Sequence, residues 1–194
     1  MTDYLSFVGR TEELKLLDDL YASGKAEFLV LYGRRRVGKT RLLTEWLNTR
    51  KIKPIFFVAE QDSRDSLLRQ FSQIIYRKAF PNLPVPETFT FASWEQAWNQ
   101  IGDLAQRERL VVFIDEFTYM MASDPTLASN LQRLWDSTLE KTSLFLCISG
   151  SHLGMMVRGV LSGTAPLYGR TTRTIMLSAS FSDKRKLQVE MHNW

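Results

Sequence analysis

Residues 33–40 follow the pattern G-x-x-x-x-G-K-T, and the residues on either side of this segment decide how the chain can fold. Residues 27–32 are apolar and rich in strand formers, whereas residues 41–47 have the apolar spacing of a helix. A strand, a glycine-bearing loop and a helix in this order direct backbone N–H groups and the positive end of a helix dipole at one point. The order therefore predicts a phosphate-binding loop, and residues 33–40 are called the phosphate loop below.

The individual residues of the phosphate loop have separate expected roles. Lys39 is expected to reach the terminal phosphates of a nucleotide, and the Thr40 hydroxyl is expected to bind Mg²⁺. Arg34, Arg35 and Arg36 are interpreted as a basic rim around a polyanionic ligand, and contact with DNA is the alternative. The residues predicted to contact the nucleotide are Gly33, Arg34, Arg35, Arg36, Val37, Gly38, Lys39, Thr40 and Arg41.

A second motif follows the apolar run at residues 110–114, which ends in Asp115 and Glu116. Strands of parallel sheets end at the ligand crevice, so both acids are expected there. Asp115 is predicted to hold Mg²⁺, mostly through water, because Mg²⁺ keeps much of its hydration shell. Glu116 is predicted to orient and polarise the water that attacks the γ-phosphate.

The apolar run at 143–149 leads into a polar segment that contains Ser149, Ser151 and His152. A serine there is in a position to contact the γ-phosphate or the attacking water, and we favour Ser151 over Ser149. The alternative is that one of the two serines caps a short helix at 152–158. His152 is interpreted as a surface residue, because Glu116 already fills the role of a base.

Strands and helices alternate along the chain, which predicts a mostly parallel sheet with helices on both faces. The expected strands lie at 27–32, 54–59, 110–114, 143–149 and 172–178. The expected helices lie at 11–22, 39–49, 64–79, 93–107, 126–140 and 152–158, and residues 81–86 are expected to be irregular.

Composition agrees with one α/β domain across residues 1–194, since 44% of the residues are hydrophobic and can fill a substantial core. Trp94 and Trp98 are spaced for core packing, although stacking on bases is the alternative. The single cysteine, Cys147, is expected to be buried. The sequence contains no secretory signal pattern and no apolar run near the roughly 20 residues that span a bilayer, so a cytoplasmic protein without membrane contact is expected.

Several motifs together resemble the archaeal and bacterial ATPase family that is placed in the STAND group of the AAA+-related P-loop NTPases. They extend over residues 5 to about 181. These motifs are Phe7-Val8-Gly9-Arg10 with Glu12-Glu13, the phosphate loop, Phe113-Ile114-Asp115-Glu116-Phe117, Gly150-Ser151 and Leu167-Tyr168-Gly169-Arg170.

The resemblance implies a three-layer α/β sandwich with a five-stranded sheet in the order 5-1-4-3-2, and ATP and Mg²⁺ as ligands. It implies that Phe7, Val8, Gly9 and Arg10 lie against the adenine, whereas the residues alone indicate a turn before a helix. It also implies that Arg170 meets a phosphate or a neighbouring subunit. A solvated loop arginine is the alternative.

Relatives in this family continue into a helical lid and a winged-helix domain, and residues 183–194 differ from that continuation. The expectation is therefore an ATPase core whose lid and winged-helix domains are absent, with slow turnover. The uncovered lid surface would suit a protein partner or a second copy of the chain. A nucleotide-binding switch module with little turnover is the alternative function, and a DNA-associated ATPase is a weaker one.

Overall fold

A single parallel sheet forms the centre of the computed structural model, which describes residues 10–178 of the 194-residue chain. Its strands are β1 (Glu27–Tyr32), β2 (Ile55–Val58), β3 (Leu110–Asp115), β4 (Leu144–Gly150) and β5 (Arg173–Met176). They lie in the order β2-β3-β4-β1-β5, and every neighbouring pair is parallel. The expected order 5-1-4-3-2 is this order read from the other edge, so the prediction is confirmed.

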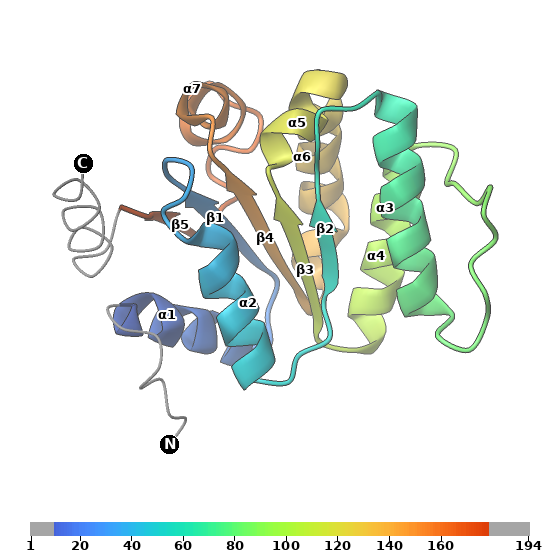
Figure 1. The fold of residues 1–194 in the computed structure, drawn as a ribbon, viewed down its shortest axis with the longest axis horizontal. Helices are drawn as coiled ribbons and strands as arrows, with labels where there is room; N and C mark the ends of the chain where they lie inside the picture. Colours follow the sequence, from blue (N-terminus) through green and yellow to red (C-terminus); the bar gives the residue numbers. More distant parts are fainter. Residues whose placement is uncertain (1–9, 179–194) are drawn as a thin grey trace, which may run out of the picture.

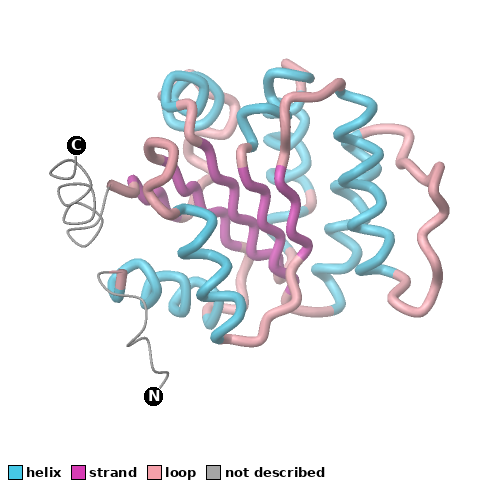
Figure 2. Tube along the Cα trace, viewed as in Figure 1, coloured by secondary structure: helices cyan, strands magenta, loops and turns pink. Residues whose placement is uncertain are grey.

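Apart from α1, which precedes β1, the helices lie between successive strands, as Figure 2 shows by colour. They are α1 (Thr11–Ala22), α2 (Lys39–Thr49), α3 (Arg64–Ala79), α4 (Trp94–Arg107), α5 (Phe117–Ser123), α6 (Leu127–Ser137) and α7 (Leu153–Met156). A 3₁₀ turn at Leu139–Lys141 follows α6, and a π-helical segment at Val157–Leu161 continues α7. None of the helices within residues 10–178 combines the length and apolar character needed to cross a membrane.

The core has two halves, one on each face of the sheet, as alternation along a buried strand requires. On β1, Phe28 and Val30 face α3, α4 and α6, whereas Leu29 and Leu31 face α1 and α2. Trp94 and Trp98 are almost fully buried in the first half, which confirms that they are core residues. Cys147 is buried in the second half, as expected, and burial raises the pKa of its thiol well above the ordinary range. The expected three-layer sandwich is therefore confirmed (Figure 1).

The clearest differences from the sequence-based expectation lie in two helices. Residues 117–123 form α5, which was not predicted, because Phe117 and Thr118 are weak helix formers. The helix is stabilised by tertiary packing, since Phe117, Thr118 and Met120 are buried. The helix predicted at 126–140 ends at Ser137, where Thr138 leaves the helical conformation.

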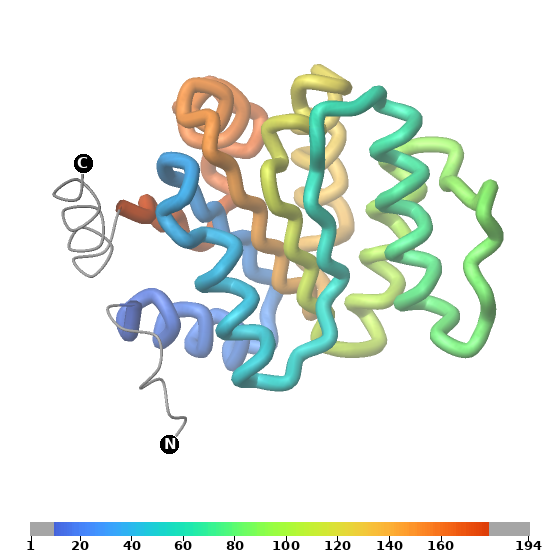
Figure 3. Tube along the Cα trace, viewed as in Figure 1, coloured from blue at the N-terminus to red at the C-terminus, as the bar shows by residue number. Residues whose placement is uncertain are grey.

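All five strands end at the same edge of the sheet, which is uppermost in Figure 1. The phosphate loop, α5 and α7 lie at this edge. Figure 3 shows that β1, from the early part of the chain, lies between β4 and β5 from its late part. The strand order therefore brings the phosphate loop next to the carboxyl ends of β4 and β5.

Candidate phosphate-binding site

The phosphate loop connects β1 to α2 and depends on glycine at both ends. Gly38 has φ +90°, a left-handed conformation that glycine adopts without strain, and it is the residue before α2. A β-carbon on Gly33 would lie 2.2 Å from the carbonyl oxygen of Leu177, just after β5. The loop therefore packs directly against the backbone at the end of β5.

Lys39 lies inside the curve of this loop. Its Nζ donates hydrogen bonds to the carbonyl oxygens of Gly33 at 3.0 Å and Arg34 at 3.1 Å. Burial lowers the pKa of Lys39, and the nearby charges of Glu116 and Asp115 oppose this shift. The ammonium group is thus poorly solvated and gains strongly from an anionic ligand.

Asp115, the last residue of β3, is buried and accepts hydrogen bonds from three groups. The hydroxyls of Thr40 and Ser149 donate to its two carboxylate oxygens, and the Glu116 N–H donates at 3.0 Å. Oxygen ligands from a hydroxyl and a carboxylate are those that Mg²⁺ prefers, so Thr40 and Asp115 fit the predicted metal role.

The contact of Ser149 with Asp115 was not predicted from the sequence, whereas the predicted contact of Ser151 with the γ-phosphate or the attacking water stays a prediction. Ile114 of β3 pairs with Ile148 of β4, so the next residues, Asp115 and Ser149, lie side by side. The sequence contained a signal for this contact, because Asp115 and Ser149 both lie at the ends of apolar runs, and parallel strands end at the same edge of the sheet. The register itself came from the structure.

Glu116 directly precedes α5, at its N-cap position, in a left-handed backbone conformation with φ 53° and ψ 43°. Its Oε2 accepts hydrogen bonds from the Ser151 N–H at 3.1 Å and from the Ser151 hydroxyl at 2.9 Å. In the described chain no side chain caps α7, so the capping alternative for Ser149 and Ser151 is wrong. His152 is exposed, as expected, and its ring meets the Tyr119 ring edge-on at 5.8 Å.

The phosphate loop, the start of α2 and Glu116 line a cleft of about 450 Å³. At its rim the Arg35 guanidinium donates to the Tyr119 hydroxyl at 3.2 Å, which joins the phosphate loop to α5. The charges of the lining are those of an anion site, with one carboxylate among four cationic side chains. The lining residues are Arg35, Arg36, Gly38, Lys39, Thr40, Arg41 and Glu116.

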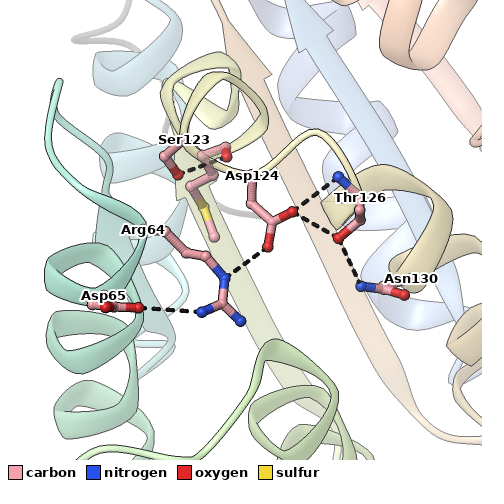
Figure 4. Close-up of polar contacts among 7 residues, drawn as sticks. Arg64, Asp65, Ser123, Asp124, Thr126 and Asn130 are labelled. Carbon is pink, nitrogen blue, oxygen red and sulfur yellow. Dashed lines mark hydrogen bonds and ion pairs between the residues drawn. The ribbon is translucent and has the colours of Figure 1, made fainter.

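The far end of α5 is fixed by a polar network that Figure 4 shows in close-up. Arg64, at the start of α3, donates to Asp124 Oδ2 at 3.0 Å, and the two side chains point toward each other. Asp124 Oδ1 accepts from the Thr126 N–H at 2.9 Å and from the Thr126 hydroxyl at 2.6 Å. Burial raises the pKa of Asp124, but the bonds from Thr126 and Arg64 outweigh it and hold the pKa below 3.8. The helix that carries Glu116 at its start is thus anchored at its end.

Arg170 does not lie in this cleft. Its Nη2 pairs with Asp136 of α6 at 2.8 Å. Two residues later, the Thr172 hydroxyl accepts from the Phe28 N–H near the start of β1, so Arg170 lies toward the edge where the strands begin. Its predicted contact with a neighbouring subunit stays a prediction.

The predicted adenine contacts fall mostly outside the described residues, because Phe7, Val8 and Gly9 precede Arg10. Arg10 itself is buried, and its guanidinium donates to the carbonyl oxygens of Val37 and Ser178. Sequence reasoning did not suggest this contact with the phosphate loop.

Comparison with known proteins agrees with the geometry. The sequence model of a family described as an ATPase domain predominantly from Archaea matches residues 7–191. An uncharacterized protein of Methanocaldococcus jannaschii, MJECL04, is 34% identical over 173 residues, which are 88% of this chain and 35% of that protein. An uncharacterized ATP-binding protein of the same organism, MJ0423, is 47% identical over 53 residues, 27% of this chain and 90% of that protein. The chain thus spans about a third of the length of MJECL04.

Solved structures share the fold. The Orc1 protein of Aeropyrum pernix in complex with DNA has a TM-score of 0.58 at 17% identity, over 98% of this chain and 52% of that one. Cdc6p of Pyrobaculum aerophilum also has a TM-score of 0.58, at 18% identity, over 92% of this chain and 47% of that one. At these identities the likeness concerns the fold.

Proposed function

The chain belongs to the family of ATPase domains found predominantly in Archaea, and we propose that its phosphate loop binds Mg-ATP and that Glu116 promotes hydrolysis. The observation that carries this proposal is the meeting of two segments, the phosphate loop and the end of β3. Lys39 of the phosphate loop and Glu116 line one cleft, which has the size and positive rim of a polyphosphate site. Asp115, the last residue of β3, is bonded to Thr40 of the same lining.

Each residue has one part in the proposed reaction. Lys39 exchanges its two carbonyl contacts for phosphate oxygens, which compensates its poor solvation. Thr40 and Asp115 would hold Mg²⁺, and the bound ion would supply positive charge beside the phosphates. Glu116 accepts a hydrogen bond from the attacking water and orients it in line with the γ-phosphate. Ser151 steadies the carboxylate of Glu116 through two hydrogen bonds.

Calorimetric titration and phosphate release test the proposal together. We expect saturable binding of ATP that depends on Mg²⁺, and release of more than one phosphate per protein molecule. The Lys39→Ala variant should lose binding while keeping its circular dichroism spectrum. Unchanged affinity in the folded variant would overturn the phosphate-site assignment.

The alternative is a nucleotide switch that binds ATP and turns it over little. The two bonds from Ser151 favour this alternative, because they already use one of the two carboxylate oxygens of Glu116, Oε2. Rapid-quench analysis separates the two functions. Binding with less than one phosphate released per molecule supports the switch, and sustained release supports the enzyme.

A DNA-associated ATPase is a weaker candidate. The Orc1 structure that shares this fold is a complex with DNA. The present chain also exposes Arg34, Arg35 and Arg36 on the phosphate loop. If these arginines hold DNA, affinity for duplex DNA falls steeply with salt, and added Mg-ATP competes for the same cations. DNA binding that changes with neither salt nor Mg-ATP would argue against this role.

Membership of the STAND group of P-loop NTPases stays a prediction.

A further inference from the structure

We propose that Arg10 is a positioning residue that sets the shape of the phosphate loop by tying it to the end of β5. The inference rests on the proposed function, since the loop must hold phosphates for its shape to matter. It replaces the expectation that Arg10 lies against the adenine. The replacement is motivated by where the guanidinium of Arg10 forms its hydrogen bonds.

Arg10 joins three elements at one buried point, since only 8% of the residue is exposed. Its Nη2 donates to the Val37 carbonyl oxygen at 3.2 Å and to the Ser178 carbonyl oxygen. Its Nη1 pairs with Glu13 of α1 at 2.9 Å. Both hydrogens of Nη2 are therefore committed to backbone carbonyls, and Glu13 compensates the buried charge.

The bond to Val37 determines where the next N–H group points. The carbonyl of Val37 and the N–H of Gly38 belong to one trans peptide, so they point in opposite directions. By holding that carbonyl on its own side, Arg10 turns the Gly38 N–H away from itself. Gly38 lines the cleft. An N–H fixed in advance binds phosphate oxygens without a further ordering cost.

The bond to Ser178 gives Arg10 a firm support. Leu177, the preceding residue, donates its N–H to the Tyr32 carbonyl oxygen at 2.7 Å, and its own carbonyl lies against Gly33. The start of the phosphate loop is thus fixed to the end of β5 by backbone contacts. Arg10 joins Val37, in the second half of the loop, to Ser178 beyond β5. The loop is therefore attached to the end of β5 at two points.

Inorganic triphosphate separates this role from an adenine contact, because it offers phosphates and no base. We compare the affinities of wild type and Arg10→Ala for Mg-triphosphate and for Mg-ATP, below the melting temperature of both. We expect about tenfold weaker binding of both ligands, a loss typical of removing a group that orients others. The matched control is Arg133→Ala, which removes an exposed arginine that pairs with Glu95, and its affinities should not change.

Other outcomes are decisive as well. If Arg10→Ala loses affinity for ATP and keeps it for triphosphate, Arg10 contacts the base and the inference is overturned. Unchanged affinity for both also overturns it. If Arg10→Ala does not fold, Arg10→Lys keeps the charge beside Glu13 but lacks the planar fork, and it should weaken both ligands equally. Full affinity in that variant counts against the inference. Failure of the wild type to bind either ligand would instead refute the proposed function.

Discussion

Ser151 donates both its backbone N–H and its hydroxyl to a single oxygen of Glu116, at 3.1 and 2.9 Å. The contact links the end of β4 to the start of α5, two segments that follow adjacent strands of the sheet. Glu116 is therefore oriented by a neighbour that is itself fixed by the sheet. This relationship makes it possible to separate the charge of Glu116 from its position.

Glu116→Gln should bind Mg-ATP about as well as wild type and hydrolyse it at least about 100-fold more slowly. The amide oxygen of glutamine can still accept both bonds from Ser151, so the geometry is kept while the basic group is lost. Titration calorimetry gives the affinity and phosphate release gives the rate. Turnover at the wild-type rate would show that Glu116 is not the base.

Asp115→Asn should change the metal requirement, because the substitution replaces a carboxylate oxygen that suits Mg²⁺ with an amide. We expect the Mg²⁺ concentration for half-maximal ATP binding to rise about tenfold or more. A titration with Mg²⁺ at fixed ATP measures this value. Glu116→Gln is the matched control, since it should leave the Mg²⁺ requirement near that of wild type.

Lys39→Met should remove most ATP affinity and yet raise the thermal stability of the nucleotide-free protein at neutral pH. One charge-assisted hydrogen bond contributes about 1.5–3 kcal/mol, so the affinity should fall at least about tenfold. Because burial lowers the pKa of Lys39 from 10.5, its charge costs stability while it is protonated. This cost disappears as the pH rises through the lowered pKa toward 10.5. The difference in melting temperature should therefore narrow with rising pH, and a constant difference would contradict the assignment.

Asp124→Asn should lower the free energy of unfolding at pH 7 by about 2 kcal/mol, because the charge-assisted bond from Arg64 is weakened. The folded pKa of Asp124 lies below 3.8, so its contribution is complete above that value and is lost as the pH falls through the folded pKa. Urea unfolding of both proteins between pH 7 and pH 3 tests this. The free energies of unfolding of the two proteins should converge as the pH falls. A difference that stays constant with pH would refute the role of the ionised carboxylate.

Much of the fold was predictable, because short sequence patterns mark where strands and helices begin and end. The apolar run at β1, the glycines and the helical spacing of α2 marked one strand–loop–helix unit, and the structure has it at the predicted residues. Asp115 and Glu116 were recognisable because two acids directly follow an apolar strand. Such signals lie within a few residues of one another in the sequence.

Features that depend on packing between distant segments were not predictable. Residues 117–123 are helical because their apolar side chains pack into the core, which local propensity does not express. The contact between Ser149 and Asp115 required the register of β3 against β4. The two bonds of Arg10, to Val37 and to Ser178, required the positions of the phosphate loop and the end of β5.

The sequence distances within the support of the phosphate loop have a consequence for folding. Arg10 and Ser178 are 168 residues apart, and the Phe28 N–H bonds a hydroxyl 144 residues later. Contacts of this span form late, because a long stretch of chain must first be closed into a loop. The residues of the phosphate loop are synthesised well before those of β5, whose end supports the loop. Nucleotide should accordingly bind the finished sheet far better than any earlier intermediate, and so act as a selective stabiliser of completely folded molecules.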